Sequence, residues 1–291
     1  MAETEDPDGG PAKSPQELKS KVSRLLEMIA KEDECKLETV DEGISGGPLK
    51  IAKPTFRNKA VDNPGLEEDL TAIVLNLSIV DGNKELMEGN PFVISFLVGS
   101  LNSRTHRTRS IAAAALSKLL VLDSNRRLIG EAGAIGPLIN VVRVGSILAI
   151  FNAASALFQL FHLTENVTNA IRARATSVIL QRLEKRTCMD ELVGLLVKLS
   201  GDQDTVEELR DIGDVPILLK VLGESIPERC KENCVVILEE ICSYYPNTAK
   251  QIRNNWDACG LLFTLSTSST ATARAQRKAT SIVKRIMNAA S

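Results

Sequence analysis

The sequence predicts an all-α solenoid, in which short groups of helices repeat and stack into one elongated domain. Three observations lead to this class. A pair of aliphatic residues recurs at a nearly constant interval, turn signals recur between the pairs, and aromatic residues make up only 3% of the 291 residues against 44% hydrophobic ones. Length alone suggests two domains, but repeats that cannot bury their own apolar faces must stack into one continuous core.

The aliphatic pairs are the strongest signal, because each has two members three residues apart on one helix face. The pairs are Val74/Leu77, Leu116/Leu119, Leu157/Leu160, Leu196/Leu199, Leu238/Ile241 and Val283/Ile286. Their second members follow one another after 42, 41, 39, 42 and 45 residues. Leu192, Leu195, Leu196 and Leu199 extend one pair to the i, i+3, i+4, i+7 stripe of a packed helix. Each pair therefore indicates a long helix.

Turn residues divide each period further. Gly133 with Pro137, and Gly213 with Pro216, place Gly after one helix and Pro at the start of the next. Each period therefore predicts a short, a medium and a long helix, the last of about 14 residues. We expect about five full repeats and an opening partial one within residues 58–291.

One repeat lacks the turn glycine and has Arg174 in its place. A residue other than Gly at positive φ costs about 1–2 kcal/mol. The sequence therefore predicts that this junction is either re-routed or locally strained.

Residues 1–57 lack the repeat and are predicted to be a mostly flexible segment with one amphipathic helix at about 15–34. Ser14-Pro15-Gln16-Glu17 is a capping-box pattern. The apolar stripe that follows consists of Leu18, Val22, Leu25, Leu26 and Ile29. This helix either docks on the first repeat or is an independent interaction helix, and residues 38–57, rich in Gly and Pro, are expected to be a linker.

Charge and patterning exclude several functional classes. A net charge of −2 argues against a nucleic-acid-binding or membrane-binding protein. No run approaches 18 apolar residues, so no transmembrane segment is expected. The acidic start is no secretory signal, and the six cysteines are expected to be reduced thiols of a cytoplasmic and/or nuclear protein.

The sequence offers no catalytic, cofactor or metal site. Cys230, Cys234 and Cys242 share one predicted helix but lack the further ligands of a zinc site, and we expect them to pack as small hydrophobic residues. Adjacent acids such as Glu239 and Glu240 point apart on a helix, which is poor geometry for acid–base catalysis. The expected protein is not an enzyme and needs no cofactor.

Several stretches resemble the armadillo repeats of plant U-box ubiquitin ligases. They are Leu75-Asn76-Leu77-Ser78-Ile79, Ala113-Ala114-Ala115-Leu116, Asp123-Ser124-Asn125, Gly133-Ala134-Ile135, Glu228-Arg229-Cys230-Lys231-Glu232-Asn233-Cys234 and Arg274-Ala275-Gln276-Arg277-Lys278. The resemblance covers about residues 60–291. It implies a right-handed superhelical armadillo-repeat α-solenoid that recruits partner proteins.

The resemblance leaves three functional readings open. Residues 1–60 show neither the Cys-Pro-Ile-type start nor the Asp-Pro-Val segment of a U-box, so the chain is similar to the armadillo half of these ligases. The favoured reading is a non-catalytic scaffold that binds partner proteins in its concave groove. The alternatives are a complete ubiquitin ligase and a free-standing armadillo adaptor outside the ubiquitin pathway.

The family pattern also implies which side chains line the groove: the residue before the second aliphatic of each pair. That ladder is Asn76, Lys118, Gln159, Lys198, Glu240 and Arg285. Only Asn76 keeps the asparagine that binds the backbone of an extended peptide. The lysines and Gln159 favour acidic, phosphorylated or polar protein segments, although exposed lysines are also common on solvated helices. The sequence does not determine the oligomeric state.

Two further features bear on the kind of partner. Importin-type nuclear carriers repeat Trp and Asn along the groove, whereas this chain has the single Trp256, expected in a short helix near the last repeat. Cationic clusters are candidate sites for phosphates or acidic segments, or else solvated surface. They are Arg104/His106/Arg107/Arg109, Arg172/Arg174/Arg182/Lys185/Arg186 and Arg274/Arg277/Lys278/Lys284/Arg285. Without interleaved aromatic residues they do not indicate nucleic-acid binding.

Overall fold

The computed structural model describes residues 64–288 apart from 202, 213–214 and 225. All secondary-structure elements in these ranges are helices, which confirms the all-α prediction. The predicted segment 1–57, with its helix at about 15–34, lies outside the described residues. Whether that helix docks on the first repeat therefore stays a prediction.

Most repeats follow the predicted order of short, medium and long helices, but in the fourth repeat the first helix, with 10 residues, is longer than the second, with 8. After an opening long helix, α3 (Pro64–Ile79), five triplets follow. They are α4 (Asp81–Met87), α5 (Pro91–Ser100) and α6 (His106–Leu119); α7 (Asp123–Glu131), α8 (Ile135–Val144) and α9 (Ile147–Leu160); α10 (Thr164–Arg172), α11 (Ala175–Glu184) and α12 (Met189–Leu199); α13 (Gln203–Ile212), α14 (Val215–Leu222) and α15 (Glu228–Tyr244); α16 (Asn247–Arg253), α17 (Trp256–Thr267) and α18 (Ala273–Asn288). The long helices vary from 11 residues in α12 to 17 in α15, so the predicted 14 residues is a mean rather than a constant.

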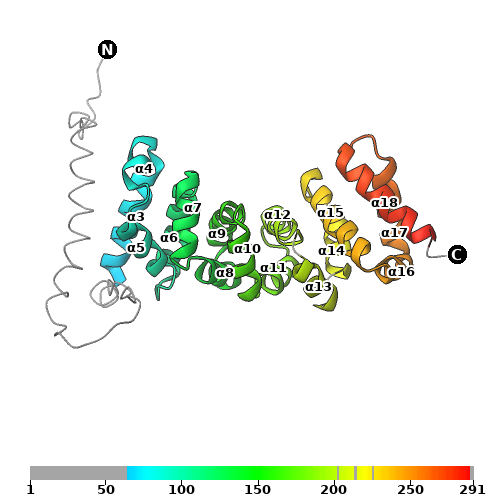
Figure 1. Cartoon of the computed structure of the whole chain (residues 1–291), viewed down its shortest axis with the longest axis horizontal. Helices are drawn as coiled ribbons and strands as arrows, with labels where there is room; N and C mark the ends of the chain where they lie inside the picture. The colour runs from blue at the N-terminus through cyan, green and yellow to red at the C-terminus, as the bar shows by residue number, and fades with distance from the viewer. Residues whose placement is uncertain (1–63, 202, 213–214, 225, 289–291) are drawn as a thin grey trace, which may run out of the picture.

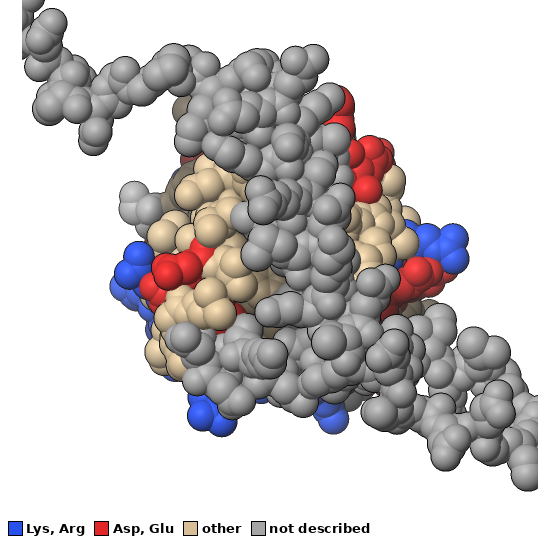
Figure 2. Space-filling model, turned by 90° about the vertical axis from the view of Figure 1, so that its left-hand side faces the viewer, with Lys and Arg blue, Asp and Glu red and all other residues tan. Residues whose placement is uncertain are grey.

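The triplets stand side by side in a curved row from α3 to α18 (Figure 1). The long helices α9 and α12 lie on the inner side of the curve, and α8 and α11 lie on the outer side. Figure 2 views the row from its N-terminal end, where Lys or Arg atoms lie next to Asp or Glu atoms at the left and right edges of the molecule. The inner, concave side is therefore formed by the third helices of successive repeats.

The core is continuous because each long helix packs against the long helix of the next repeat. The contacts run from α3 to α6, then to α9, α12, α15 and α18. The inner aliphatic pairs, such as Leu157/Leu160 and Leu196/Leu199, are buried at these junctions. Removing one such side chain typically costs 2–5 kcal/mol, so the repeated pairs are the main reason that the repeats stack.

Side-chain caps fix where several helices begin. The Asn90 side chain accepts hydrogen bonds from the backbone N–H groups of Phe92 and Val93 at 3.0 and 3.2 Å, with Pro91 as the first residue of α5. The Thr105 hydroxyl accepts from Thr108 N–H at 3.1 Å at the start of α6. Each cap satisfies an otherwise unpaired donor and contributes about 1 kcal/mol.

Buried asparagines clamp the first helix of a repeat onto the preceding long helix. The Asn125 side chain donates to the Leu119 carbonyl at 2.9 Å and accepts from Gly89 N–H at 2.9 Å. One repeat later, Asn166 donates to the Leu160 carbonyl at 3.0 Å. The last carbonyls of α6 and α9 thereby gain a partner.

The junction at Arg174 follows the strained alternative of the sequence prediction and is not re-routed. Arg174 has φ 60° and ψ 38°, a left-handed conformation like that of Gly133 with φ 84°. Its N–H donates to the Ile171 carbonyl at 2.9 Å, and its carbonyl accepts from Val178 N–H at 3.2 Å. These bonds hold the turn in place, while its guanidinium reaches Glu208 only at 3.9 Å.

Candidate partner-binding groove

The concave side carries a cavity of about 620 Å³ that is lined by residues of four successive repeats. It lies along α9, α12 and α15 and ends at the first turn of α18. Its lining residues are Phe151, Ala154, Ser155, Phe158, Gln159, Asp190, Glu191, Gly194, Val197, Lys198, Arg229, Glu232, Asn233 and Arg274. Because all four helices are the third helices of their repeats, this cavity is a section of the concave groove.

The floor of the cavity is apolar at its α9 end. Phe151 and Phe158 leave 47% and 38% of their surface exposed, whereas Ile150, Leu157 and Leu160 of the same helix are buried. Opposite them on α12, Gly194 has no side chain, and a Cβ built there would approach only the Asn233 amide, at 4.0 Å. Two aromatic faces thus lie beside an open position, an arrangement that has room for an apolar side chain.

Ion pairs between neighbouring repeats line the rest of the cavity. The Arg229 guanidinium contacts the Asp190 carboxylate at 2.8 Å, and Arg274 contacts Glu232 at 3.3 Å. These pairs join α12 to α15 and α15 to α18. The two charges of each pair cancel. The pairs therefore link neighbouring helices and add little net charge to the groove.

Lys198 is the cation that the described residues leave without an acidic partner inside the cavity. Its ammonium lies 5.0 Å from the centre of the Phe158 ring, and such cation–π contacts contribute about 0.5–1 kcal/mol at exposed sites. The His162 ring packs edge to face against the same Phe158 ring, with the two ring centres 5.8 Å apart. Lys198 is thus held over the groove floor while its charge faces the cavity.

The structure brings two of the six ladder residues into the cavity. Gln159 and Lys198 line it, and the Gln159 amide oxygen also accepts from Arg126 at 3.1 Å. Asn76 and Lys118 are exposed on α3 and α6, beyond the N-terminal end of the cavity. The ladder as a binding surface remains a prediction.

The last two ladder residues, Glu240 and Arg285, lie outside the cavity. Each of them contacts the helix that carries the other. Glu240 on α15 lies 3.8 Å from Lys278 of α18. Arg285 on α18 donates to the Ser243 hydroxyl of α15 at 3.1 Å. Both side chains are engaged between α15 and α18, which reduces what they can offer a partner.

Glu239, one residue before the ladder position, is the acid that joins α15 to α18. This buried carboxylate accepts from Lys278 at 2.7 Å, from Ser281 at 3.1 Å and from Ser243 at 3.2 Å. Burial opposes its ionisation, but the hydrogen bond and charge of Lys278 together with both hydroxyls hold the pKa of Glu239 below its ordinary value. Sequence reasoning treated Glu239 and Glu240 only as acids that point apart, because the partner from the next repeat is 39 positions away.

Sequence reasoning also missed the groove aromatics Phe151 and Phe158. A signal was present: α9 reads Ile-Leu-Ala-Ile-Phe-Asn-Ala-Ala-Ser-Ala-Leu-Phe-Gln-Leu, which is apolar over more than the one stripe that a packed helix needs. The excess apolar residues had to face either solvent or a partner. Tertiary structure was needed to place them on the concave side.

The cationic clusters are mostly engaged with acids or backbone. Arg107 reaches Glu68 at 3.1 Å, and Arg109 donates to the Ser103 carbonyl at 2.6 Å. In the second cluster, Arg182 donates to the Val142 carbonyl at 2.9 Å. These contacts favour a structural role for the first two clusters.

The cysteines of α15 are buried. Cys230, Cys234 and Cys242 have free thiols, and burial raises the pKa of Cys242 to about 12. They pack as small hydrophobic residues, as expected. In the part of the chain that the structure describes, no group of three His, Cys, Asp or Glu residues is placed to hold a metal ion, and no helix there is long and apolar enough to cross a bilayer.

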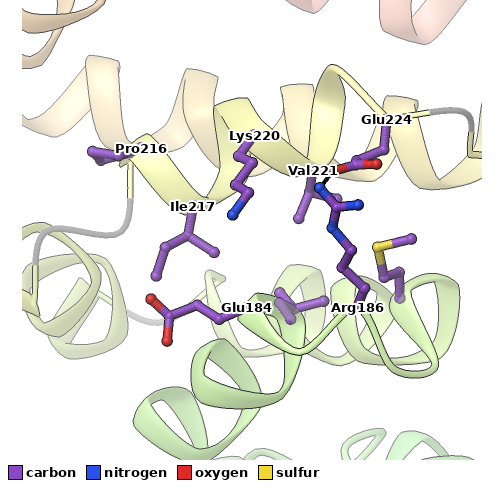
Figure 3. A pocket seen from close by; sticks show the side chains of 9 residues that line it. Glu184, Arg186, Pro216, Ile217, Lys220, Val221 and Glu224 are labelled. Atoms are coloured by element: carbon purple, nitrogen blue, oxygen red, sulfur yellow. Dashed lines mark ion pairs between the residues drawn. The ribbon is translucent and has the colours of Figure 1, made fainter.

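A smaller hollow of about 220 Å³ lies outside the groove, between α11 and α14 (Figure 3). Arg186 pairs with Glu224 at 2.5 Å across it. Ile217 and Lys220 of α14 point toward Glu184 of α11. This hollow is smaller than the groove cavity, and the ion pair closes one side of it. Its exposed Lys220 lies outside the groove and is therefore suited to a control substitution.

Solved structures with the same architecture are armadillo-repeat proteins. A designed armadillo-repeat protein, YIII(Dq)4CqI, superposes with a TM-score of 0.63 over 78% of this chain and 97% of its own, at 17% identity. Another, solved in complex with the peptide (KR)4, gives a TM-score of 0.61 over 78% and 97% at 16% identity. At this identity the likeness concerns the fold.

Sequence comparison supplies the relatives. U-box domain-containing protein 9 of Arabidopsis thaliana is 41% identical over 82% of this chain, and putative U-box domain-containing protein 46 of the same plant is 34% identical over 67%. The chain is an armadillo-repeat solenoid whose homologues are plant U-box domain-containing proteins. This confirms the resemblance and the fold class. The armadillo chain spans about half the length of these relatives, 52% and 43%, and no protein-family model matches it.

Proposed function

We propose that this armadillo solenoid is a non-catalytic scaffold of the cytosol or nucleus that binds partner proteins in its concave groove. The observation that carries the proposal is the 620 Å³ cavity along α9, α12 and α15, with two exposed phenylalanines on its floor. Monomeric proteins rarely leave aromatic side chains exposed in a concave site without a ligand that covers them.

The cavity favours an extended segment with one apolar and one acidic side chain. The apolar side chain fits against Phe151 and Phe158, beside the space that Gly194 leaves open. An acidic or phosphorylated side chain then meets Lys198, because Asp190 and Glu232 are already paired with arginines. Lys118 and Asn76 lie further along the same series of helices and would extend this preference toward the N-terminal end.

Affinity capture from plant lysate tests the groove with the full chain as bait. We expect the partners captured by the wild type to be lost with Phe158→Ala/Lys198→Glu, because that variant removes both the aromatic floor and the cation. Lys220→Glu, an identical charge change on exposed α14 outside the groove, is the matched control and should keep them. Equal capture by all three proteins would remove the groove from the proposal.

The U-box in the names of the homologues supports a role for this scaffold in protein ubiquitination, where it would recruit the protein to be modified. A second candidate is a complete ubiquitin ligase, which is favoured only by the U-box in the names of the relatives. An in vitro assay with ubiquitin, activating enzyme and several conjugating enzymes separates the two. We expect no ubiquitin chains from this protein alone, whereas chain formation would establish the ligase.

A further inference from the structure

Three residues on one face of α12 give the groove cavity a negative end, an open middle and a positive end. Glu191, Gly194 and Lys198 all line the cavity and stand at positions i, i+3 and i+7 of the helix. Residues at these spacings share one helix face. The helical rise puts Glu191 and Lys198 about 10 Å apart along the axis, with Gly194 between them.

The end near the first turn of α12 carries one negative charge in excess. The charged residues of this end that line the cavity are Asp190, Glu191, Arg229, Glu232 and Arg274. Each arginine is paired with one acid of this set, at 2.8 and 3.3 Å, and Glu191 is the third acid. Its charge adds to that of Asp190, whose hydrogen bond and charge are the main reasons that the pKa of Arg229 is raised. The cavity therefore has a net negative charge at this end.

The opposite end carries a positive charge. Lys198 lies in the last turn of α12, and its ammonium, 5.0 Å from the centre of the Phe158 ring, has no acidic partner among the described residues that line the cavity. An acid near the N-terminus of a helix and a cation near its C-terminus both complement the helix dipole. The α12 helix can therefore hold Glu191 and Lys198 without a partner, and both charges stay available to a ligand.

Glycine keeps the middle of this row open, although it is a poor helix former. A Cβ at Gly194 would approach only the Asn233 amide, at 4.0 Å, so packing within the chain does not require glycine here. At Gly130, in contrast, a Cβ would lie 2.3 Å from a side chain of the next repeat. The space at Gly194 opens into the cavity, whose lining also includes the exposed rings of Phe151 and Phe158. Its effect is to leave room for a side chain of a ligand.

We infer, on the basis of the proposed partner-binding function, that this row selects an extended segment of another protein with a basic, a large apolar and an acidic residue at alternate positions. The basic residue, Lys or Arg, meets Glu191. The apolar residue, of the size of Leu or Phe, occupies the space over Gly194. The acidic residue, Asp or Glu, meets Lys198. Opposite charges at the two ends of the row favour this segment over a uniformly acidic or basic one.

The spacing fits an extended chain that lies alongside α12. Side chains two positions apart in such a chain share one face and are about 7 Å apart, so three of them span about 13 Å. Glu191 and Lys198 are about 10 Å apart along the helix, and the flexible Lys, Arg and Glu side chains adjust to the difference. Either direction of the segment can present this order of side chains to the row.

Three fluorescently labelled peptides test the charge requirement by fluorescence anisotropy with the full chain. A label is needed because Trp256, expected in a short helix, is the first residue of the 12-residue α17 and does not line the cavity. All peptides are capped and have a central Leu. The mixed probe has Lys two positions before it and Glu two positions after it, the acidic probe has Glu at both positions, and the basic probe has Lys at both. We expect the acidic and basic probes to bind about fivefold more weakly than the mixed probe, because each exchanges one attraction for a repulsion.

Two charge reversals should change which probe binds best. With Glu191→Lys the acidic probe should bind most tightly, and with Lys198→Glu the basic probe should, because each variant gives both ends of the row the same charge. Lys220→Glu on α14, outside the groove, is the matched control and should keep the preference for the mixed probe. Circular dichroism verifies that the variants, all at exposed or partly exposed positions, keep their helices.

Filling the space over Gly194 tests the apolar position. Gly194→Leu should weaken binding of all three probes about tenfold, whereas its thermal midpoint should not fall, because Leu favours a helix more than Gly does. Gly99→Leu on α5 is the matched control, since a Cβ there meets no atom within 4 Å and Gly99 does not line the cavity. It should bind the probes like the wild type.

Four outcomes overturn the inference. Equal binding of the mixed and acidic probes, with both lost in Phe158→Ala, would show that the groove needs no basic residue, and the proposed function would stand without this requirement. Tighter binding of a peptide with Lys, Leu and Glu at the helical positions i, i+4 and i+7 would identify a helical partner instead. Sedimentation that shows a dimer, abolished by Gly194→Leu, would identify a second copy of the chain as the occupant. Binding of none of the probes would also overturn it, while affinity capture with Phe158→Ala/Lys198→Glu decides the proposed function separately.

Discussion

The second and third repeats, α7–α9 and α10–α12, have the same architecture but differ in how their turns are made. The second repeat has Gly133 at its left-handed position, with φ 84°. The third repeat has Arg174 there, and its loop before α12 adds Arg186 with φ 55° and Cys188 with φ 48°. These three are the non-glycine residues with positive φ among the described residues. Strain is therefore concentrated in one repeat of the row.

The comparison shows that the stacking of the helices decides the turn conformation. The residue at the turn only sets how much free energy that conformation costs. The core positions of α12, Leu192, Leu195, Leu196 and Leu199, are fully buried despite the strained turns on either side of the preceding helix. Burying each leucine contributes about 1.5–3 kcal/mol, which exceeds the cost of a left-handed arginine. A repeat can therefore lose its glycine without losing its fold.

The largest expected effect lies where the two repeats meet. In Gly130→Ala, the new Cβ would lie 2.3 Å from the Oδ1 atom of Asn166, whose amide is bonded to the Leu160 carbonyl. We expect a loss of about 2–3 kcal/mol in the free energy of unfolding, since Asn166 cannot move without breaking that bond. Urea denaturation measures the loss. Gly136→Ala, which meets no atom within 4 Å, is the control and should be neutral or stabilising.

The asparagine clamp gives the next effect. Asn166→Ala should cost about 1–2 kcal/mol, because it removes a buried hydrogen bond between the repeats. In the following repeat Thr205 is the third residue of the first helix, as Asn166 is in its own, and its buried hydroxyl has no partner among the described residues. Thr205→Val should therefore be neutral or stabilising in the same urea titration. If Asn166→Ala and Thr205→Val lowered the free energy of unfolding by similar amounts, the hydrogen bond of Asn166 would not be what makes its position more important than that of Thr205.

Exchanging the turn residues tests the comparison itself. Arg174→Gly should raise the free energy of unfolding by about 0.5–1 kcal/mol, because relief of the left-handed strain exceeds the entropy that Gly adds to the unfolded chain. Gly133→Ala should lower it by about 1–2 kcal/mol for the same reason. Thermal denaturation of both variants reports the two signs. If Arg174→Gly were destabilising, the strain at the third repeat would not exist.

The smallest effect is a pH dependence at the last junction, outside both repeats. The pKa of Glu239 is lowered in the folded protein, so its stabilising contribution is present above the ordinary value of 4.5 and is lost as the pH falls through the folded-state value below it. We expect the difference in unfolding free energy between wild type and Glu239→Gln to narrow below about pH 4.5. Arg174→Gly should show the wild-type pH profile, and a change there would link the strained turn to this distant ion pair.

The sequence by itself determined the solenoid, the number of repeats and the three-helix unit that ends in a long helix. It could do so because apolar spacing, Gly turns and Pro starts act within a few residues, and the aliphatic pairs repeat that local information five times over. It also singled out the junction at Arg174 as either re-routed or strained, because the missing glycine is visible against its neighbours, and the structure decided between the two.

Only the tertiary structure decided which side chains line the concave surface and which are engaged in contacts between repeats. Gln159 and Lys198 entered the cavity, whereas Glu240 and Arg285 contact the neighbouring helix and Glu239 became the buried link. The partners in these contacts lie about 40 residues apart in the chain, and a helix that shifts by one residue turns its side chains by 100°. Side-chain direction at a repeat junction therefore depends on how two helices pack, which no single repeat specifies.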